Sequence, residues 1–593
     1  MSPRTAPCSV ELASATALHL ALYRSVAGSG AGALGLSISE APAWAPFDNG
    51  VMPGPVARML MTRRRLLSIA FFSIVLIPIA AIVYRHLTTT TASFLKTTVL
   101  QMASTHPPPV IVVGAGLAGL SAAYSALQAG APSVRLLERA AKPGGNSIKA
   151  SSGINGAPTR FQDVAKHGVD QSFCEDTVKS AGSRLHASVA ESVRKQRQDL
   201  ISVLTSRSAS AIDFLVDLGV DLSVVAQLGG HSKPRTHRGA GKTPPGASIV
   251  TTLLAKLKEH EGRFELVTEA EVTKLLLTAN NQVTGVEYRK DGASHSLAGP
   301  VVFATGGFGG DTHGLLARYR PDLDGLPSTN DPRPGAHDLL AAGAGAALVD
   351  MESVQVHPTG FVDPAAPRAP LKFLAAEVLR GEGGILLHRG RRIVNELATR
   401  DKISGVIMDL PLPDAEGEGE DGAGGLRQWD VQLLLDPGTA EAAAGHVGFY
   451  LWKGLLQKKK VADLDEATRE TLREYAAVVR GEKPDEFGRT AFGHWTLGAD
   501  GSGIAEDAEV CVGRVTPIVH FTMGGVVFNE QAQVLSSALG EAQKPIQGLW
   551  AAGEITGGIH GDNRLGGSSL LECVVFGRIA GEQAAQSVLK AEA

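Results

Sequence analysis

Unbroken apolar runs alternate with a helical segment in the first ordered part of the chain. Residues 110–113 are Val-Ile-Val-Val, a β-branched run without a polar position, which is typical of a parallel strand buried on both faces. Residues 117–129 have helical composition and end at a glycine, and residues 133–137 return to a strand pattern. These three segments predict a βαβ unit. Late in the chain, residues 548–554 predict another short strand and residues 568–589 a closing helix.

A longer apolar run near the start of the chain has the length of a membrane span. Residues 66–84 contain no charged side chain and follow Arg63-Arg64-Arg65. About 20 apolar residues cross a bilayer core. A buried core helix is the alternative, but the arginines on one flank and the lack of amphipathic spacing argue against it. There is no clear small-residue cleavage site, which favours an uncleaved anchor over a removed signal peptide.

We therefore expect an unstructured leader at residues 1–60 and a signal-anchor helix with its tether at residues 61–106. The basic cluster precedes the apolar run, so the positive-inside bias places the body of the chain on the non-cytosolic side. The endoplasmic reticulum and the mitochondrion are both compatible with this prediction.

Composition limits the classes of function. A chain of 593 residues is too long for one hydrophobic core and predicts several domains. With 20% charged residues and a net charge of −4, there is no basic surplus of the kind that nucleic-acid binding needs. The four cysteines are far apart and form no CxxC pair, so neither a structural metal nor a disulfide framework is indicated. The acidic, glycine-rich residues 413–427 predict a solvated loop.

A dinucleotide fingerprint joins the first strand to the first helix. Gly114, Gly116 and Gly119 match GxGxxG at this junction, and Glu138 follows at the end of the second strand. The glycines let a pyrophosphate approach the helix N-terminus, where unpaired N–H groups favour anions. An acidic residue at this distance suits a ribose hydroxyl. The fingerprint predicts dinucleotide binding and leaves FAD and NAD open.

Further motifs point to one family. They are Gly-Gly-Asn-Ser at 144–147, Ala-Ser-Ser-Gly-Ile-Asn at 150–155, Phe-Ala-Thr-Gly-Gly-Phe-Gly at 303–309, Ala-Ala-Gly-Glu at 551–554 and Asn-Arg-Leu-Gly-Gly-Ser-Ser-Leu at 563–570. With these motifs the chain resembles the flavoprotein family of fumarate reductases and succinate dehydrogenases from about residue 108 to 585. Residues 227–232 and 354–364 are similar to the soluble, fungal-type fumarate reductases in particular.

The resemblance implies an α/β fold whose Rossmann-like FAD-binding domain is split in sequence. Its two parts are residues 107–350 and 520–593, with an inserted α+β capping domain at 351–519. The family's flavin-attachment histidine has no counterpart in residues 146–149, so FAD is expected to be noncovalent. The implied FAD contacts are Gly114, Gly116, Ala118, Gly119, Glu138, Asn146, Ser147, Ser151, Ser152, Val272, Glu554 and Leu570. One contact is missing, because the family's Gly-Asp-Gly is Gly335-Ala336-His337 here.

The resemblance also implies a site for a small dianion. Arginine suits carboxylates because its planar fork donates two parallel hydrogen bonds. The implied substrate contacts are Ser152, His357, Glu377, His520, Arg564 and Gly567. Arg400 corresponds to the family's proton donor, and an arginine, with a pKa above about 12, is a poor acid unless it is desolvated and promptly reprotonated. Glu377 and Arg380 match the family's proton relay, and their spacing puts both on one side if the segment is helical. A plain helical ion pair is the alternative.

The expected activity is reduction of fumarate to succinate, with hydride transfer from reduced FAD and protonation by Arg400. The chain has no CxxCH haem motif, so a diffusible donor such as a reduced flavin is expected to supply the electrons. Three alternatives remain at this point. They are a reductase of another unsaturated acid such as urocanate, a ketosteroid dehydrogenase on the same fold, and a membrane-tethered flavin-binding protein without turnover. Steroid enzymes of this fold use tyrosines where this chain has Arg400.

Overall fold

The computed structural model describes residues 107–241, 243–413, 425–537 and 543–592. The predicted leader at 1–60, the predicted anchor and tether at 61–106, and most of the acidic segment 413–427 lie outside these ranges. Within the described ranges, no helix is both long enough and apolar enough to cross a bilayer.

The predicted βαβ unit is present at the predicted place. Strand β1 (Val110–Val113) leads into helix α4 (Leu117–Gln128) and then into β2 (Val134–Leu137), which pairs with β1 in parallel. The sheet has six strands in the order β20-β21-β10-β1-β2-β6. Its other members are β6 (Phe264–Val267), β10 (Val301–Phe303), β20 (Gln533–Leu535) and β21 (Pro545–Ala551), and only the β20–β21 pair is antiparallel. Strands from both ends of the described chain share this sheet, which confirms the predicted split of the Rossmann-like fold.

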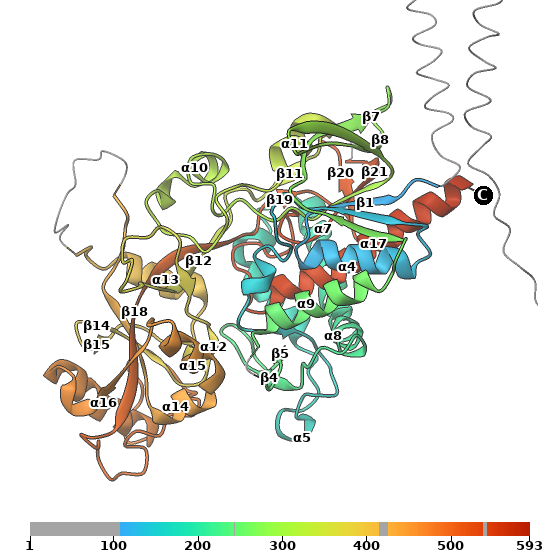
Figure 1. The fold of residues 1–593 in the computed structure, drawn as a ribbon. Coiled ribbons are helices and arrows are strands. Elements are labelled where there is room, and N and C mark those ends of the chain that lie inside the picture. Colours follow the sequence, from blue (N-terminus) through green and yellow to red (C-terminus); the bar gives the residue numbers. More distant parts are fainter. Residues whose placement is uncertain (1–106, 242, 414–424, 538–542, 593) are drawn as a thin grey trace, which may run out of the picture. The chain divides into compact units, whose positions relative to one another are not determined.

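Both faces of the sheet are covered by other elements (Figure 1). The alternation of side chains along β1 shows which elements cover each face. Val110 and Val112 belong to a core formed with helices α4, α9 (Pro245–Lys258) and α17 (Ser568–Glu592). Ile111 and Val113 point to the other face and belong to a second core. That core includes side chains of the antiparallel strands β7 (Glu271–Leu277), β8 (Val283–Lys290) and β9 (Ala293–Ala298).

Helices α4 and α17 lie side by side although they are far apart in sequence (Figure 1). Two glycines of α17 permit their close approach. A Cβ atom at Gly577 would lie 2.6 Å from the carbonyl oxygen of Ala118, and one at Gly581 would lie 2.1 Å from that of Ala122. Since Ala118 belongs to the GxGxxG segment, this contact holds the dinucleotide fingerprint against the C-terminal helix.

The segment between β2 and β6 adds a small helical layer and a three-stranded antiparallel sheet. The helices are α5 (Val164–His167), α6 (Phe173–Ala181), α7 (Glu191–Ser206), α8 (Ser208–Asp217) and α9, and the 3-10 turns are η2 (Ser147–Lys149) and η3 (Gly182–Leu185). The strands are β3 (Ile154–Asn155), β4 (Val224–Ala226) and β5 (Thr236–Arg238), in the order β3-β5-β4. Between β10 and the second large sheet lie α10 (Leu315–Tyr319), η4 (Pro321–Leu323), α11 (His337–Ala344) and β11 (Leu348–Val349), which pairs with β19 (Gly525–Val526).

The second large sheet is antiparallel and belongs to the inserted region. Its strand order is β13-β12-β18-β16-β14-β15, with β17 also paired to β18. The strands are β12 (Val354–Phe361), β13 (Phe373–Leu374), β14 (Ile385–His388), β15 (Arg391–Arg392), β16 (Val431–Leu435), β17 (Gln457–Lys460) and β18 (Glu509–Thr522). The helices are α12 (Val378–Gly381), α13 (Arg400–Met408), α14 (Pro437–Ala442), α15 (Ala444–Trp452) and α16 (Glu466–Val479), with η5 (Val461–Asp463).

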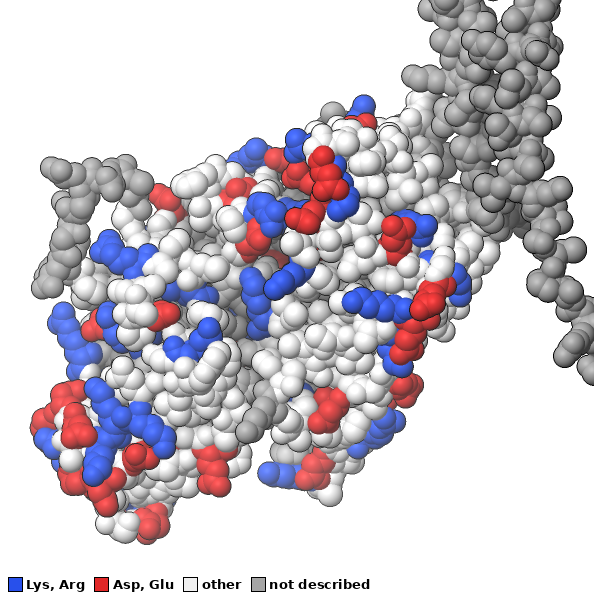
Figure 2. Space-filling view, in the orientation of Figure 1, with Lys and Arg blue, Asp and Glu red and all other residues white. Residues whose placement is uncertain are grey.

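This mixture of sheet and helices is the predicted α+β cap. Strand β18 runs without interruption through the boundary predicted between residues 519 and 520. The long strand therefore joins the cap directly to the second part of the flavin-binding region. Acidic and basic side chains are interspersed over the face in Figure 2, in line with the small net charge of −4.

Candidate active site

The loop between β1 and α4 has the shape that a dinucleotide pyrophosphate requires. Gly114 has a φ of +102°, and a Cβ there would lie 2.4 Å from the carbonyl oxygen of Ala304. A Cβ at Gly119 would lie 1.8 Å from the carbonyl oxygen of Gly114. The N-cap residue Gly116 has no side chain to occupy the helix N-terminus, and the first turn holds no acidic residue. Apart from that of Leu117, the N–H groups of this turn are therefore available to an anion, and the residues present fit FAD.

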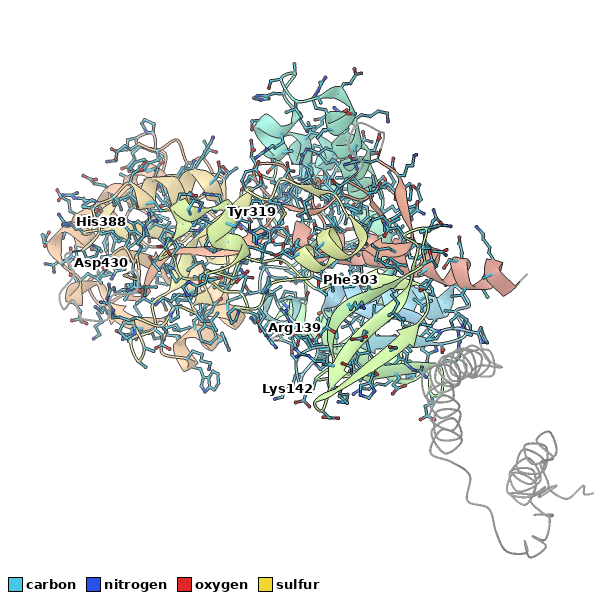
Figure 3. All side chains as sticks on the ribbon, turned by 90° about the horizontal axis from the view of Figure 1, so that it is seen from above. Arg139, Lys142, Phe303, Tyr319, His388 and Asp430 are labelled. Atoms are coloured by element: carbon cyan, nitrogen blue, oxygen red, sulfur yellow. The ribbon has the colours of Figure 1, made fainter. Side chains whose placement is uncertain are left out.

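Glu138 is held rigidly at the end of β2. Its two carboxylate oxygens accept hydrogen bonds from the backbone N–H groups of Ala115 at 2.7 Å and Ala140 at 2.8 Å. A carboxylate has about four acceptor positions, so capacity remains for a ribose hydroxyl. The N–H of Ala270 donates to the Glu138 carbonyl at 2.9 Å, which brings the start of β7, with the half-buried Val272, to the same place. Figure 3 labels Phe303, the last residue of β10, and Arg139, two residues beyond the end of β2, and it labels His388 and Asp430 in the cap.

The second glycine loop is tied to its surroundings through polar side chains. The Ser147 hydroxyl accepts from the N–H of Leu117 at 3.2 Å, so the loop lies against the first turn of α4. Asn146 donates to the side chain of Asn330 at 2.8 Å. His446 of the cap helix α15 hydrogen-bonds the carbonyl oxygen of Ser151 at 2.7 Å, next to the half-buried Ser152. The expected flavin contacts on this loop thus lie where the cap meets the FAD-binding region.

Glu554 and Leu570 are both expected at the flavin; Glu554 is half-buried and Leu570 is buried. Glu554 Oε1 accepts from the backbone N–H of Thr522 at 3.0 Å. Burial, together with the nearby carboxylate of Glu572, raises the pKa of Glu554 to about 7. The N–H of Ala336 donates to the Thr305 hydroxyl at 3.0 Å. Where the family has a carboxylate, this position presents backbone groups and a methyl group to the cofactor.

A buried ion pair forms the centre of the candidate substrate site. Arg400 is the first residue of α13, and its Nε and Nη2 donate to Glu377 Oε2 at 2.8 and 2.5 Å. The other oxygen of Glu377 accepts from the N–H of Gly229 at 3.0 Å. Burial alone would raise the pKa of Glu377, but the charges of Arg400 and Arg380 and these hydrogen bonds lower it to about 2. Glu377 is therefore an anion at neutral pH.

Arg380 lies behind this pair on a short helix. Glu377 is the N-cap residue of α12, so the helical spacing expected for the two side chains is present. Arg380 Nη1 donates to the carbonyl oxygen of Glu396 at 2.7 Å, while its Nε and Nη2 are buried without a hydrogen-bond partner. Burial lowers the pKa of Arg380 to about 10. Among the described contacts, Arg380 thus interacts with Glu377 through charge, without a hydrogen bond between the side chains.

Gln355 is a site residue that the sequence analysis missed. Its Oε1 accepts from Arg400 Nη1 at 2.8 Å and from Arg564 Nη2 at 3.0 Å. Its Nε2 donates to Asn563 Oδ1 at 2.9 Å and to the Arg564 carbonyl at 2.8 Å, which fixes the orientation of the amide. The available signal was a long polar side chain within the fully buried strand β12, since a buried amide must find partners.

Arg564 completes a pair of buried cations. It is 2% exposed and lies over the ring of Phe521 at 4.4 Å. Burial, and then the neighbouring charge of Arg400, lower the pKa of Arg564 to about 9. Its Nε is buried and without a hydrogen-bond partner. The two guanidiniums are held near each other by a neutral amide, so the site keeps its positive charge.

Two neutral histidines lie beside the cations. The rings of His357 and His520 meet edge-on at 5.3 Å between centroids. His357 Nδ1 accepts from the backbone N–H of Thr359 at 3.2 Å, so Nε2 carries the proton, and it is buried without a partner. His520 Nδ1 lies 3.2 Å from the Thr329 hydroxyl. Burial, followed by the charge of Arg400, lowers the pKa of both histidines well below 6.5. His357 Nε2 is a free donor for a carboxylate.

The loop carrying Arg564 and Gly567 lies directly against the ion pair. A Cβ at Gly566 would lie 3.0 Å from Glu377 Oε2 and 3.2 Å from Arg400 Nη2. The structure thus brings Glu377, Arg400 and the loop at 563–570 together from three distant segments. His357 and His520 join them, since the charge of Arg400 acts on both rings.

Comparison with known proteins agrees with this arrangement. A family model described as FAD binding domain matches residues 109–570. A fumarate reductase of Schizosaccharomyces pombe is 41% identical over 501 residues, which are 81% of this chain and 90% of that protein. Fumarate reductase 1 of Saccharomyces cerevisiae is 41% identical over 497 residues, which are 80% of this chain and 98% of that protein. The solved open conformation of a flavocytochrome c3 fumarate reductase has a TM-score of 0.61 and 30% identity, covering 84% of this chain and 81% of its own. The chain belongs to the fumarate reductase family of FAD-binding flavoproteins.

Proposed function

We propose that this protein catalyses the FAD-dependent reduction of fumarate to succinate. The observation that carries the proposal is the buried pair of guanidiniums, Arg400 and Arg564, joined by the neutral amide of Gln355. Arg564 and the free Nε2–H of His357 offer donors to the carboxylates of a small planar dianion, and Arg400, paired with Glu377, adds a second guanidinium beside them. The two relatives described above carry the name fumarate reductase.

The residues divide the work between binding and proton delivery. Arg564, His357 and His520 grip the carboxylates and stabilise the charge that builds on one of them in the transition state. Arg400 donates a proton to one alkene carbon while the other carbon receives a hydride. Bound FAD, in its reduced form, supplies that hydride.

Arg400 must be reprotonated after each turnover. The carboxylate of Glu377 accepts two of its N–H groups and is ionised, so it can take up a proton from the side of Arg380 and pass it to the deprotonated Arg400. Arg380 lies on the next turn behind Glu377, and its lowered pKa makes it a better proton carrier than an exposed arginine. We assign Glu377 and Arg380 to this relay. A diffusible reduced flavin or a similar donor supplies the electrons.

The test is anaerobic oxidation of a chemically reduced dye by the purified FAD-loaded protein, with a panel of acceptors. We expect rapid oxidation with fumarate and formation of succinate. We expect little oxidation with urocanate, which has one carboxylate, or with a ketosteroid, which has none. Activity with urocanate and none with fumarate would assign the site to another unsaturated acid, and inactivity with every acceptor would favour a flavin-binding protein without turnover.

We further propose that residues 66–84 tether the protein to a membrane, with the FAD-binding region on the non-cytosolic side. The support is the uncharged run itself and the three arginines before it. The test is alkaline extraction and protease protection of membranes that contain the full-length protein. Release of the protein by alkaline carbonate would exclude a spanning segment, and digestion without detergent would place the body on the cytosolic side.

A further inference from the structure

His231 is a buried histidine whose proton position the structure determines. Its Nδ1 lies 2.8 Å from Arg235 Nη1, and its Nε2 lies 2.9 Å from the carbonyl oxygen of Gly566. A guanidinium only donates, so Nδ1 is the acceptor and the proton is on Nε2. His231 therefore donates a hydrogen bond to Gly566. Burial, followed by the charge of Arg235, lowers the pKa of His231 to about 4, so the ring is neutral at physiological pH.

Arg235 is fully occupied by fixed partners. It is completely buried and forms a two-pronged pair with Asp170, at 2.7 and 3.0 Å. Its Nη1 also donates to Asp176 at 2.5 Å, and its Nη2 to the Ser172 hydroxyl at 3.1 Å. Together with the bond to His231, all five N–H groups of the guanidinium have a partner. The Arg235 side chain cannot rotate without breaking several charged hydrogen bonds, so it holds the His231 ring in place.

The Gly566 carbonyl is anchored from two sides. Asn155 Nδ2 donates to the same oxygen at 2.8 Å, and the N–H of Asn155 donates to the carbonyl oxygen of Gly567 at 3.2 Å. Gly567 has a φ of +82°, and a Cβ there would lie 2.3 Å from Asn155 Oδ1, so this conformation requires glycine. His231 is thus one of two side-chain donors that fix the Gly566–Gly567 peptide.

The orientation of this peptide has a consequence for the substrate site. In a trans peptide the C=O and the following N–H point in opposite directions. His231 and Asn155 pull the Gly566 carbonyl to one side, so the Gly567 N–H points to the other. Gly566 itself lies against Glu377 and Arg400.

We propose that His231 is a positioning residue that aims the backbone N–H of Gly567 at a substrate carboxylate, and that Arg235, with Asp170 and Asp176 behind it, locks the His231 ring for this purpose. The inference rests on the proposed function, since it assigns a part of the same dianion site. A backbone N–H fixed in advance stabilises a carboxylate without reorganisation during binding.

The test compares His231→Ala with His231→Gln in the FAD-loaded full-length protein. His237→Ala is the matched control, because His237 is also buried, on the strand β5 that follows the loop of His231, but bonds to Thr159 and to the Arg235 carbonyl. A hydrogen bond to a charged group is worth about 1.5–3 kcal/mol, so we expect His231→Ala to raise KM for fumarate about tenfold or more, with kcat changed much less. His231→Gln keeps an N–H donor and should recover most of the loss.

A second readout does not depend on turnover. We expect succinate binding to raise the melting temperature of the native protein, and this shift should shrink in His231→Ala and remain in His237→Ala. An unchanged KM and an unchanged succinate shift in His231→Ala would overturn the inference. An equal loss in His237→Ala would also overturn it, because the effect would then be one of general packing. If the wild type reduces no fumarate, the proposed function fails first, and this inference fails with it. If His231→Ala does not fold, the comparison of His231→Gln with the wild type decides the question by the same two readouts.

Discussion

Gln355 determines how much positive charge the candidate site offers. Its carbonyl oxygen accepts from both Arg400 and Arg564, and its position within buried β12 excludes water from the contact. A neutral acceptor brings two guanidiniums together without cancelling their charge. A carboxylate at the same position would form an ion pair with each of them and compete with the substrate.

The substitution Gln355→Glu tests this charge argument. We expect KM for fumarate to rise at least about tenfold, because the site loses the equivalent of one positive charge, and tenfold corresponds to about 1.4 kcal/mol. Steady-state kinetics measures the effect. Gln196→Glu adds the same charge on α7, where Gln196 donates only to the Phe528 carbonyl, and it should leave KM unchanged. Equal KM values in the two variants would contradict the role of Gln355.

The substitution Arg400→Ala tests the assignment of the acid. Binding depends chiefly on Arg564, His357 and His520, so we expect kcat to fall far more than affinity changes. General acid catalysis is typically worth about 10²–10⁴-fold, and kcat should fall by at least that factor. Arg564→Ala, by contrast, should raise KM strongly. If Arg400→Ala keeps more than about a tenth of the wild-type kcat, another group is the acid.

At the scale of single residues, the sequence predicts those that belong to contiguous motifs. Arg400, His357 and Arg564 could be chosen because each lies in a short segment shared with the family. Gln355 and His231 also lie in segments that resemble the family, residues 354–364 and 227–232, but their roles depend on partners more than two hundred residues away. Long-range pairs of this kind are products of the tertiary fold and leave no local pattern.

Helices α4 and α17 show how elements distant in sequence build the cofactor site. Gly581 lies in the middle of α17, where glycine normally weakens a helix. Here the missing Cβ lets the helix approach the backbone of α4, since a Cβ at Gly581 would lie 2.1 Å from the Ala122 carbonyl oxygen. The stability gained from this close packing outweighs the low helix propensity of glycine.

The same substitution at two helical glycines should therefore have opposite effects. Gly581→Ala should lower the melting temperature and weaken FAD retention, because α17 must move away from α4. Gly448→Ala on α15 is the control, since a Cβ there meets nothing within 4 Å. We expect Gly448→Ala to raise the free energy of unfolding by up to about 1 kcal/mol through helix propensity. Thermal unfolding measures both, and a stabilised Gly581→Ala would contradict the packing argument.

The elements that the sequence predicts well are those with a strong local period. The unbroken run at 110–113 gives β1 at the same residues, and the predicted closing helix at 568–589 extends to Glu592 as α17. The late strand predicted at 548–554 lies at 545–551, because Gly548 at a φ of +78° is accommodated inside β21. The cap sheet was not predicted strand by strand, since β18 obtains its partners from three separate strands, β12, β16 and β17.

On the scale of the whole molecule, buried neutral histidines predict sensitivity to acid. Burial lowers the pKa of His231, His237 and His337 to about 4, below the ordinary value of 6.5. As pH falls, the unfolded chain protonates these histidines near pH 6.5, whereas the folded chain protonates them only near pH 4. The stability that the neutral histidines allow is therefore full above about pH 6.5 and is lost as pH falls toward about 4. Glu554, with its raised pKa, increases the stability of the folded chain as pH falls from about 7 to about 4.5, but this is one group against three histidines.

We therefore expect the melting temperature to fall as pH is lowered from about 6.5 to about 4. Below that interval, protonation of Glu377 continues the loss, because its folded pKa of about 2 is below the ordinary value of 4.5. Scanning fluorimetry across this range measures the effect. A melting temperature that stays constant or rises on acidification would contradict the assignment of neutral buried histidines.

Noncovalent FAD is a second property of the whole molecule. The segment 146–149 contains no histidine to form a covalent bond to the flavin, and the cradle at Gly114–Gly119 holds a dinucleotide through backbone groups. Acid denaturation should release all FAD into the supernatant, and the protein should have the mass of the polypeptide alone. Flavin that remains with the precipitate would show covalent attachment.

The central claim is that this site delivers reducing equivalents to fumarate, and a single-turnover experiment tests it most directly. The FAD-loaded protein is reduced anaerobically to completion, freed of reductant and mixed with fumarate in a stopped-flow instrument. We predict that the absorbance of oxidised flavin returns rapidly and that one succinate forms per FAD. A flavin that stays reduced in the presence of saturating fumarate, while the protein is folded and loaded, would contradict the account.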